Sequence, residues 1–139
     1  MAVDFQVTVD SIDPHALAKF WSAALGYDVE DNSDFIRSLL DQGVANESDV
    51  IEVEGRLAWR IGDAIRHPDR TRRILFMAVP DPTPGKNRWH LDLDVGREQI
   101  DAEVARLTTL GATEQYRVDE PGSFHTTMAD PEGNLFCLH

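Results

Sequence analysis

Three ionisable side chains, His90, Asp92 and Asp94, alternate with leucines along one stretch near the middle of the chain. Alternate residues of a β-strand share a face, so these side chains would point the same way. A histidine that a carboxylate orients is a common general base, and this predicts His90 and Asp92 as catalytic residues. The alternative is a structural histidine that hydrogen-bonds between the two halves of the fold.

A second pair with chemical potential, Cys137 and His139, shares a face of the last strand expected, 134–139. Cys137 is the only cysteine, which excludes an intrachain disulfide and a multi-thiolate metal cluster. A cationic neighbour such as His139 would activate the thiol as a nucleophile. Alternatively, Cys137 is a small apolar residue of the core.

A third group alternates along residues 3–10, where Gln6, Thr8 and Asp10 share the polar face. We expect these three to bind a small ligand together with Cys137 and His139. Trp59 is a further ligand-binding candidate, since its ring would stack on an aromatic ligand or fill the space between the two halves. His125 would join the pocket or lie at its rim, and His15 and His67 are expected at the surface.

Two helices are expected to position these strands, one in each half of the chain. Asp13-Pro14 is typical of a helix start, the apolar residues that follow recur at helical spacing, and Gly26 would end the helix. In the second half, 97–110 has the same pattern and ends before Gly111. A strand precedes each helix at a similar spacing, which indicates an internal repeat.

The remaining segments complete the same order of elements in both halves. In the first half Asp34 would cap a helix over 35–42, and Gly55 would join 50–54 and 57–61 as a hairpin. The other expected strands are 27–30, 74–79 (apolar throughout and thus buried on both faces), 88–95, 112–118, 123–128 and 134–139. We therefore predict an α+β fold of two βαβββ modules in one domain of 139 residues: about 1–80, a linker over 81–87, and about 88–139.

Composition argues against a nucleic-acid partner and against a membrane-spanning segment. The chain has 25 acidic and 13 basic side chains and a formal charge of -12, which disfavours nucleic acid. No apolar run is long enough to cross a membrane, and Asp4 and Asp10 interrupt the N-terminal apolar residues, unlike a signal peptide. We expect a soluble, cytoplasmic protein.

The motifs together resemble the glyoxalase-like domain proteins of the vicinal oxygen chelate superfamily, which includes glyoxalases, bleomycin resistance proteins and dioxygenases. They are Asp13-Pro14 with Phe20-Trp21 and Leu25-Gly26, Leu75-Phe76 with Val79-Pro80, Lys86-Asn87-Arg88 with His90-Leu91-Asp92-Leu93, Leu107 with Leu110-Gly111-Ala112, and Asp130-Pro131-Glu132-Gly133-Asn134 with Phe136-Cys137. The resemblance implies an open half-barrel whose concave face holds a small ligand, and a homodimer.

The resemblance also implies where a metal would bind. Metal-dependent members take His, Glu or Gln ligands from four strand positions, which here fall on Gln6, on Phe76 or Met77, on His90 and on Cys137. Of these, His90 is the usual ligand type, and Cys137 stands where a glutamate is expected. We therefore expect no metal and no other cofactor at a family-type site. A rearranged divalent-metal site using His90, Asp92 and His139 is the alternative.

These expectations lead to one main function and two alternatives. The main prediction is a glyoxalase-like protein that binds a small organic ligand in the concave cavity without a family-type metal. The alternative is a lyase, isomerase or metal-dependent enzyme that uses His90. A regulator that recognises a partner through 34–58 is a third class, while glyoxalase I activity is not expected.

Overall fold

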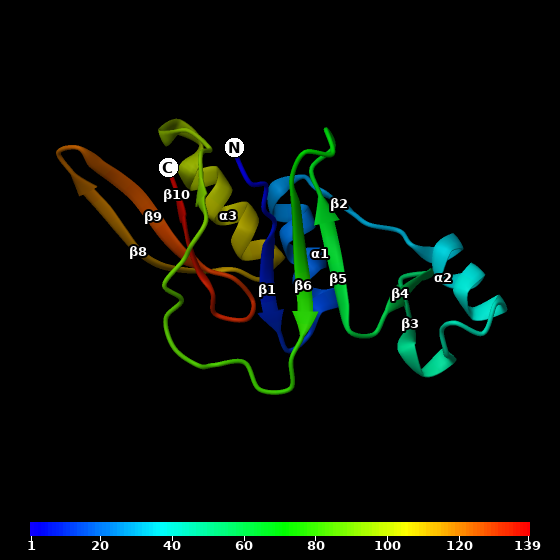
Figure 1. Cartoon of the computed structure of the whole chain (residues 1–139). Coiled ribbons are helices and arrows are strands. Elements are labelled where there is room, and N and C mark those ends of the chain that lie inside the picture. The colour runs from blue at the N-terminus through cyan, green and yellow to red at the C-terminus, as the bar shows by residue number, and fades with distance from the viewer. The chain divides into compact units, whose positions relative to one another are not determined.

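Two four-stranded sheets, one in each half of the chain, form the framework of the fold (Figure 1). The computed structural model describes residues 1–139, which fall into two units, Met1–Pro82 and Thr83–His139. We call these unit 1 and unit 2. None of the helices combines the length and the apolarity that a membrane crossing requires.

Each unit repeats one order of elements. Unit 1 contains β1 (Val7–Ser11), α1 (Pro14–Leu25), β2 (Asp28–Val29), β5 (Gly62–Arg66) and β6 (Arg73–Ala78), with the sheet order β1-β6-β5-β2. Unit 2 contains β7 (Asp92–Leu93), α3 (Ile100–Leu110), β8 (Thr113–Glu120), β9 (Ser123–Ala129) and β10 (Leu135–Leu138), with the order β7-β10-β9-β8. In each sheet the strands that come first and last along the chain, β1 with β6 and β7 with β10, pair in parallel. The other neighbouring strands pair antiparallel. The predicted α+β fold of two βαβββ modules is confirmed.

The helices form where their local signals predicted. Asp13 caps α1, because its Oδ1 accepts a hydrogen bond from the backbone N of Ala16 at 3.1 Å, and Gly26 ends it with φ of 69°. Its apolar stripe, Leu17, Ala18, Phe20, Trp21 and Ala24, is buried. In unit 2 a 3₁₀ turn, η2 (Arg97–Gln99), leads into α3, whose Ile100, Val104 and Leu107 are buried.

An insertion separates β2 from β5 in unit 1. It consists of α2 (Ser33–Asp41), a 3₁₀ turn η1 (Glu47–Asp49), and the hairpin of β3 (Val50–Val53) and β4 (Arg56–Trp59). Glu54 and Gly55 both have positive φ, the backbone that a tight two-residue hairpin turn requires. The hairpin was predicted, whereas the expected Asp34 cap is wrong: Asn32 is the N-cap residue and Asp34 lies in the first turn.

Three strand predictions need correction. The first strand is Val7–Ser11 rather than 3–10, and Val3 and Phe5 are exposed. The strand expected over 88–95 covers only Asp92–Leu93. Its first part is irregular because the Asn87 side chain takes the place of a strand partner: Nδ2 donates to Leu135 O at 3.0 Å, and Leu135 N donates to Oδ1 at 2.7 Å. β5 was not predicted as a strand, because it begins with Gly62 and Asp63, two residue types that are uncommon in strands.

β6 was expected to be buried on both faces, and it is not. Ile74 and Phe76 are buried, whereas Leu75 and Met77, on the other face, are half-buried. The alternation means that α1 covers one face of the sheet and leaves the other open. We call this second face the open face of unit 1, and the face of the unit 2 sheet opposite α3 the open face of unit 2.

Candidate functional site

On the open face of unit 2, strand register brings three reactive side chains together. β10 places Cys137 beside Asp92 of β7 on one side and beside Thr127 of β9 on the other. His90 Nδ1 lies 2.9 Å from Asp92 Oδ1, and one ligand-type atom from each of His90, Asp92 and Cys137 lies within 4.8 Å of the others. We call these three residues the His90 cluster.

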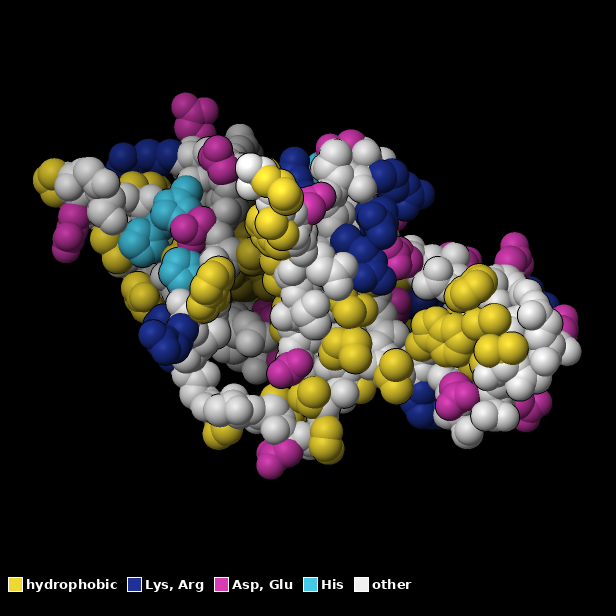
Figure 2. All heavy atoms as spheres, viewed as in Figure 1, with side chains coloured by type: hydrophobic (Ala, Val, Ile, Leu, Met, Phe, Trp, Pro, Cys, Tyr) yellow, Lys and Arg dark blue, Asp and Glu magenta, His cyan; other side chains and the backbone are white.

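Two more histidines lie next to this cluster. His139 Nε2 is 3.7 Å from Asp92 Oδ1, and the rings of His139 and His125 are 5.4 Å apart between centroids. Figure 2 shows histidine side chains gathered around an acidic side chain on this part of the surface. His125 therefore lies on the open face of unit 2, with its residue half-buried.

Two of the three side chains of the His90 cluster, and the neighbouring His139, are open to solvent. The side chains of His90, Asp92 and His139 are 41%, 53% and 43% exposed. Cys137 is half-buried, and its Sγ lies 3.4 Å from the hydroxyl of Thr127, which is itself buried. The arrangement offers an oriented imidazole for proton transfer, or nitrogen, oxygen and sulfur donors for a metal ion.

The predicted binding residues of unit 1 lie on its own open face. Thr8 and Asp10 are exposed and pair in register with Leu75 and Met77. Gln6 is also exposed, and its Oε1 accepts a hydrogen bond from Arg73 Nη1 at 3.0 Å. These three residues belong to unit 1, and His90, Asp92, Cys137 and His139 belong to unit 2, so a cavity shared by all of them stays a prediction.

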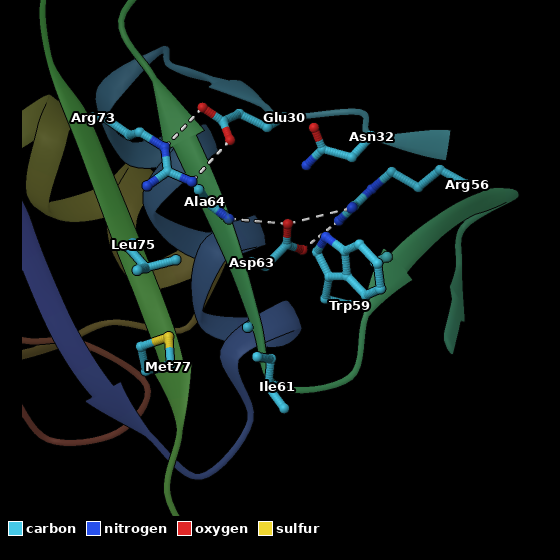
Figure 3. Close-up of a pocket in the computed structure, with 12 residues that line it drawn as sticks. Glu30, Asn32, Arg56, Trp59, Ile61, Asp63, Ala64, Arg73, Leu75 and Met77 are labelled. Atoms are coloured by element: carbon cyan, nitrogen blue, oxygen red, sulfur yellow. Dashed lines mark hydrogen bonds and ion pairs between the residues drawn. The ribbon is translucent and has the colours of Figure 1, made fainter. Parts of the chain in front are cut away.

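A pocket of about 220 Å³ lies within unit 1, between the insertion and the open face of the sheet (Figure 3). Leu75 and Met77 point into it from β6, and Trp59 and Ile61 approach from the end of the hairpin. Its other lining residues are Glu30, Asn32, Arg56, Ala58, Gly62, Asp63, Ala64 and Arg73. Of the residues predicted to bind ligand, Trp59 lines this pocket; Trp89, the other candidate for stacking, is 93% exposed.

Ion pairs hold the charged groups at the pocket rim. Glu30 accepts hydrogen bonds from Arg73 at 2.9 and 3.1 Å and from Arg66 at 2.9 Å. The hydrogen bond from Arg73 is the main cause that lowers the pKa of Glu30; partial burial opposes it, and Arg66 adds to it. The carboxylate is thus held ionised, and the two arginines already occupy its hydrogen-bond acceptors. The apolar floor of the pocket, formed by Leu75 and Met77, is left as the main surface for a ligand.

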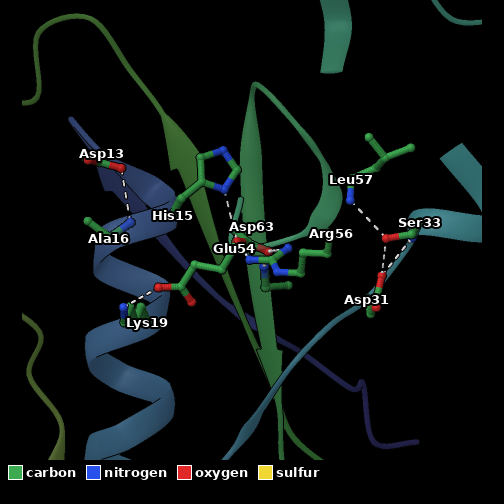
Figure 4. A network of polar contacts seen from close by, with 11 residues as sticks. Asp13, His15, Ala16, Lys19, Asp31, Ser33, Glu54, Arg56, Leu57 and Asp63 are labelled. Atoms are coloured by element: carbon green, nitrogen blue, oxygen red, sulfur yellow. Dashed lines mark hydrogen bonds and ion pairs between the residues drawn. The ribbon is translucent and has the colours of Figure 1, made fainter. Parts of the chain in front are cut away.

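A buried polar network joins the insertion to the rest of unit 1 (Figure 4). Asp63, whose side chain is 4% exposed, forms an ion pair with Arg56 of β4, and its Oδ2 lies 3.0 Å from His15 Nδ1. The expected surface position of His15 is wrong, because its side chain is 12% exposed and its Nε2 is buried without a partner. Sequence reasoning missed Asp63, Arg56 and His15, since no local pattern reveals a contact across 48 residues.

The residues at the family's four metal positions do not together form a site for a divalent cation. Gln6 is held by Arg73, and Phe76 is fully buried on the face that α1 covers. Met77 lies on the open face, yet it offers only a thioether sulfur. The fourth position is the soft thiol of Cys137 in place of the expected glutamate, so His90 alone among the four keeps a ligand of the family's type that is free to bind.

Comparison with known proteins places this fold in a family. The model of the glyoxalase-like domain matches residues 6–139. No match emerged among curated proteins. A glyoxalase/bleomycin resistance protein/dioxygenase family enzyme from Burkholderia phytofirmans superposes with a TM-score of 0.64 at 17% identity, covering 96% of this chain and 94% of that one.

Two fosfomycin resistance proteins called FosX are also similar in structure. FosX from Mesorhizobium loti gives a TM-score of 0.66 at 14% identity, over 100% of this chain and 91% of that one. FosX from Listeria monocytogenes, in complex with Mn(II) and sulfate, gives 0.63 at 13% identity, over 100% and 90%. At these identities the structures support the fold, and the family model covers nearly the whole chain. The chain belongs to the glyoxalase-like domain family.

Proposed function

We propose that this protein binds a small organic molecule in the pocket of unit 1. The observation that carries the proposal is the apolar floor of Leu75 and Met77 facing the Trp59 ring, inside a rim of paired charges. A ligand would gain from burying apolar surface on this floor and from stacking on the indole.

The pocket also limits what the ligand is. Its volume of about 220 Å³ lies below the roughly 300–1,000 Å³ of pockets for drug-sized molecules, so the ligand is small. The carboxylates of Glu30 and Asp63 already have arginine partners, which favours a neutral, planar or aromatic molecule over a charged one. Asn32, with its side-chain amide at the rim, would provide a donor and an acceptor for a polar substituent.

Fluorine-detected NMR screening of small aromatic fragments tests this function. We expect hits whose binding weakens at least tenfold in Trp59→Leu, because the stacking surface is lost. Trp89→Leu is the matched control, since that indole is exposed and lines no part of this pocket. Hits that bind equally well to Trp59→Leu would exclude this pocket as the site.

A second candidate function is catalysis at the His90 cluster. The 2.9 Å contact between His90 and Asp92 favours it, because a carboxylate that orients an imidazole prepares it for proton transfer. A lyase or isomerase would use His90 in this way, whereas a metal-dependent enzyme, of the kind suggested by the Mn(II) complex of FosX, would use it as a ligand. Turnover that His90→Ala leaves unchanged would rule out both forms.

We further expect a cytoplasmic homodimer with no nucleic-acid partner. The resemblance to the glyoxalase-like family motivates the dimer, and the charge of -12 motivates the absence of nucleic acid. Sedimentation equilibrium at several concentrations tests the dimer, and a monomer throughout would contradict it.

A further inference from the structure

We infer that unit 2 alone builds a site for a thiophilic divalent cation such as Zn²⁺, with His90, Asp92, Cys137 and His139 as the ligands. This goes beyond the proposed ligand binding in unit 1, which rests on different residues. It shares His90 and Asp92 with the second candidate function, and metal binding is measured separately from turnover. It also differs from the family arrangement, in which both modules supply ligands, because all four donors here belong to one unit.

The spacing of the donor atoms is the first argument. Zinc bonds of about 2.0–2.3 Å in a tetrahedral site put neighbouring donors roughly 3.3–3.8 Å apart. The three donors of the His90 cluster lie within 4.8 Å of one another, and His139 Nε2 lies 3.7 Å from Asp92 Oδ1. His90, Asp92 and His139 are all substantially exposed, so their side chains can turn the remaining distance without disturbing the core.

The rigidity of the support is the second argument. Asp92 and Cys137 are register partners in the parallel pair β7–β10, so the sheet fixes the separation of their backbones. Backbone hydrogen bonds continue on both sides of this pair, from Cys137 N to Leu91 O at 3.0 Å and from His139 N to Leu93 O at 2.9 Å. The buried hydroxyl of Thr127 contacts the sulfur and would orient it, as outer partners of metal ligands commonly do.

The types of donor decide which metal the site prefers. Magnesium and calcium take oxygen ligands, and carboxylate and water also suit manganese. A site with two imidazoles, one carboxylate and one thiolate suits zinc or cobalt, because thiolate is a soft ligand. Cys137 thus shifts the metal preference of the site away from Mn²⁺. It stands in the position where the family pattern has a glutamate.

Titration of the metal-free, reduced full chain with Co²⁺ tests the inference, because Co²⁺ reports its ligands through its absorption spectrum. We expect saturation at one Co²⁺ per chain, intense visible bands of tetrahedral coordination, and a near-ultraviolet thiolate charge-transfer band. Zn²⁺ should displace the Co²⁺, and equimolar Mn²⁺ should not. Cys137→Ser should abolish the charge-transfer band, and His90→Ala should weaken binding at least tenfold.

The chain provides its own matched control in unit 1. His67 and Asp69 repeat the His-X-Asp spacing of His90 and Asp92, with His67 Nδ1 2.6 Å from Asp69 Oδ1, but no cysteine accompanies them. His67→Ala should therefore leave the Co²⁺ spectrum and stoichiometry unchanged. The inference is overturned if the wild type binds no Co²⁺, if Cys137→Ser keeps the charge-transfer band, or if Mn²⁺ displaces Co²⁺. Circular dichroism of each variant confirms that the fold is intact.

Discussion

Replacing Asp63 with asparagine removes the buried negative charge that pairs with Arg56 of the insertion and contacts His15 of α1. Loss of one partner from a buried ion pair costs about 3–5 kcal/mol, since the other charge is left uncompensated. The Arg56 side chain is 17% exposed and can regain some hydration, so we place the cost of Asp63→Asn just below this range, at about 2–3 kcal/mol. For a chain of this size that corresponds to a fall in Tm of roughly 6–10 °C, measured by circular dichroism.

Glu54→Gln is the matched control for this prediction. Glu54 lies in the hairpin turn and pairs with Lys19 of α1, so it also joins the insertion to the helix. Both side chains are largely exposed, at 65% and 69%, and we expect almost no change in Tm. Equal shifts in Tm for the two variants would refute the reasoning that burial of Asp63 makes its pair important. A double variant with Arg56→Met should lose less than the sum of the single losses, because no unpaired charge remains.

Two further predictions concern the sheet of unit 1. The pKa of Glu30 is lowered in the folded state from its ordinary 4.5, so the stability that Glu30 contributes is full above that pH and is lost as pH falls through the lowered value. In urea unfolding, the free energy of unfolding of Glu30→Gln should therefore be lower than that of the wild type at pH 7, and the difference should shrink below pH 4.5. A difference that does not depend on pH would contradict this. A methyl group added at Gly62 would lie 2.8 Å from Phe76 O. Gly62→Ala should therefore lower the free energy of unfolding by about 1–3 kcal/mol. An unchanged midpoint of urea unfolding would contradict this prediction.

Sequence predicted best where the signals were local. The cap, the apolar stripe and the terminal glycine of α1 lie within a few turns of each other, and each acts as predicted. The repeat of the βαβββ order followed from the same kind of signal. The hairpin of the insertion was also predictable, because its turn needs positive φ and Gly55 provides it.

Sequence predicted least where a distant residue decides the local structure. An alternating pattern over 88–95 predicts a long strand, but the Asn87 amide satisfies Leu135 and displaces the strand pairing. Asp63 belongs to a short polar-looking segment, and its burial depends on Arg56 and His15, which come from other elements. The pocket of unit 1 was hidden for the same reason, because its walls come from segments that are far apart in the sequence.

Candidate site residues on one strand face were easier to group. Alternation placed His90 with Asp92 and Cys137 with His139, and the register of β7 with β10 brings the two pairs side by side. Strand pairing is a long-range property, so the sequence suggested only part of that grouping as a metal site, the alternative of His90, Asp92 and His139.

Zinc content per chain is the measurement that tests this account of the site most directly. Reduced protein is incubated with Zn²⁺, desalted and analysed by mass spectrometry, for the wild type, Cys137→Ser and Gln6→Ala. We predict one Zn²⁺ per chain in the wild type and in Gln6→Ala, and loss of the metal in Cys137→Ser, because the ligands all come from unit 2. A wild type that retains no zinc, or a Gln6→Ala variant that loses it, would contradict the account.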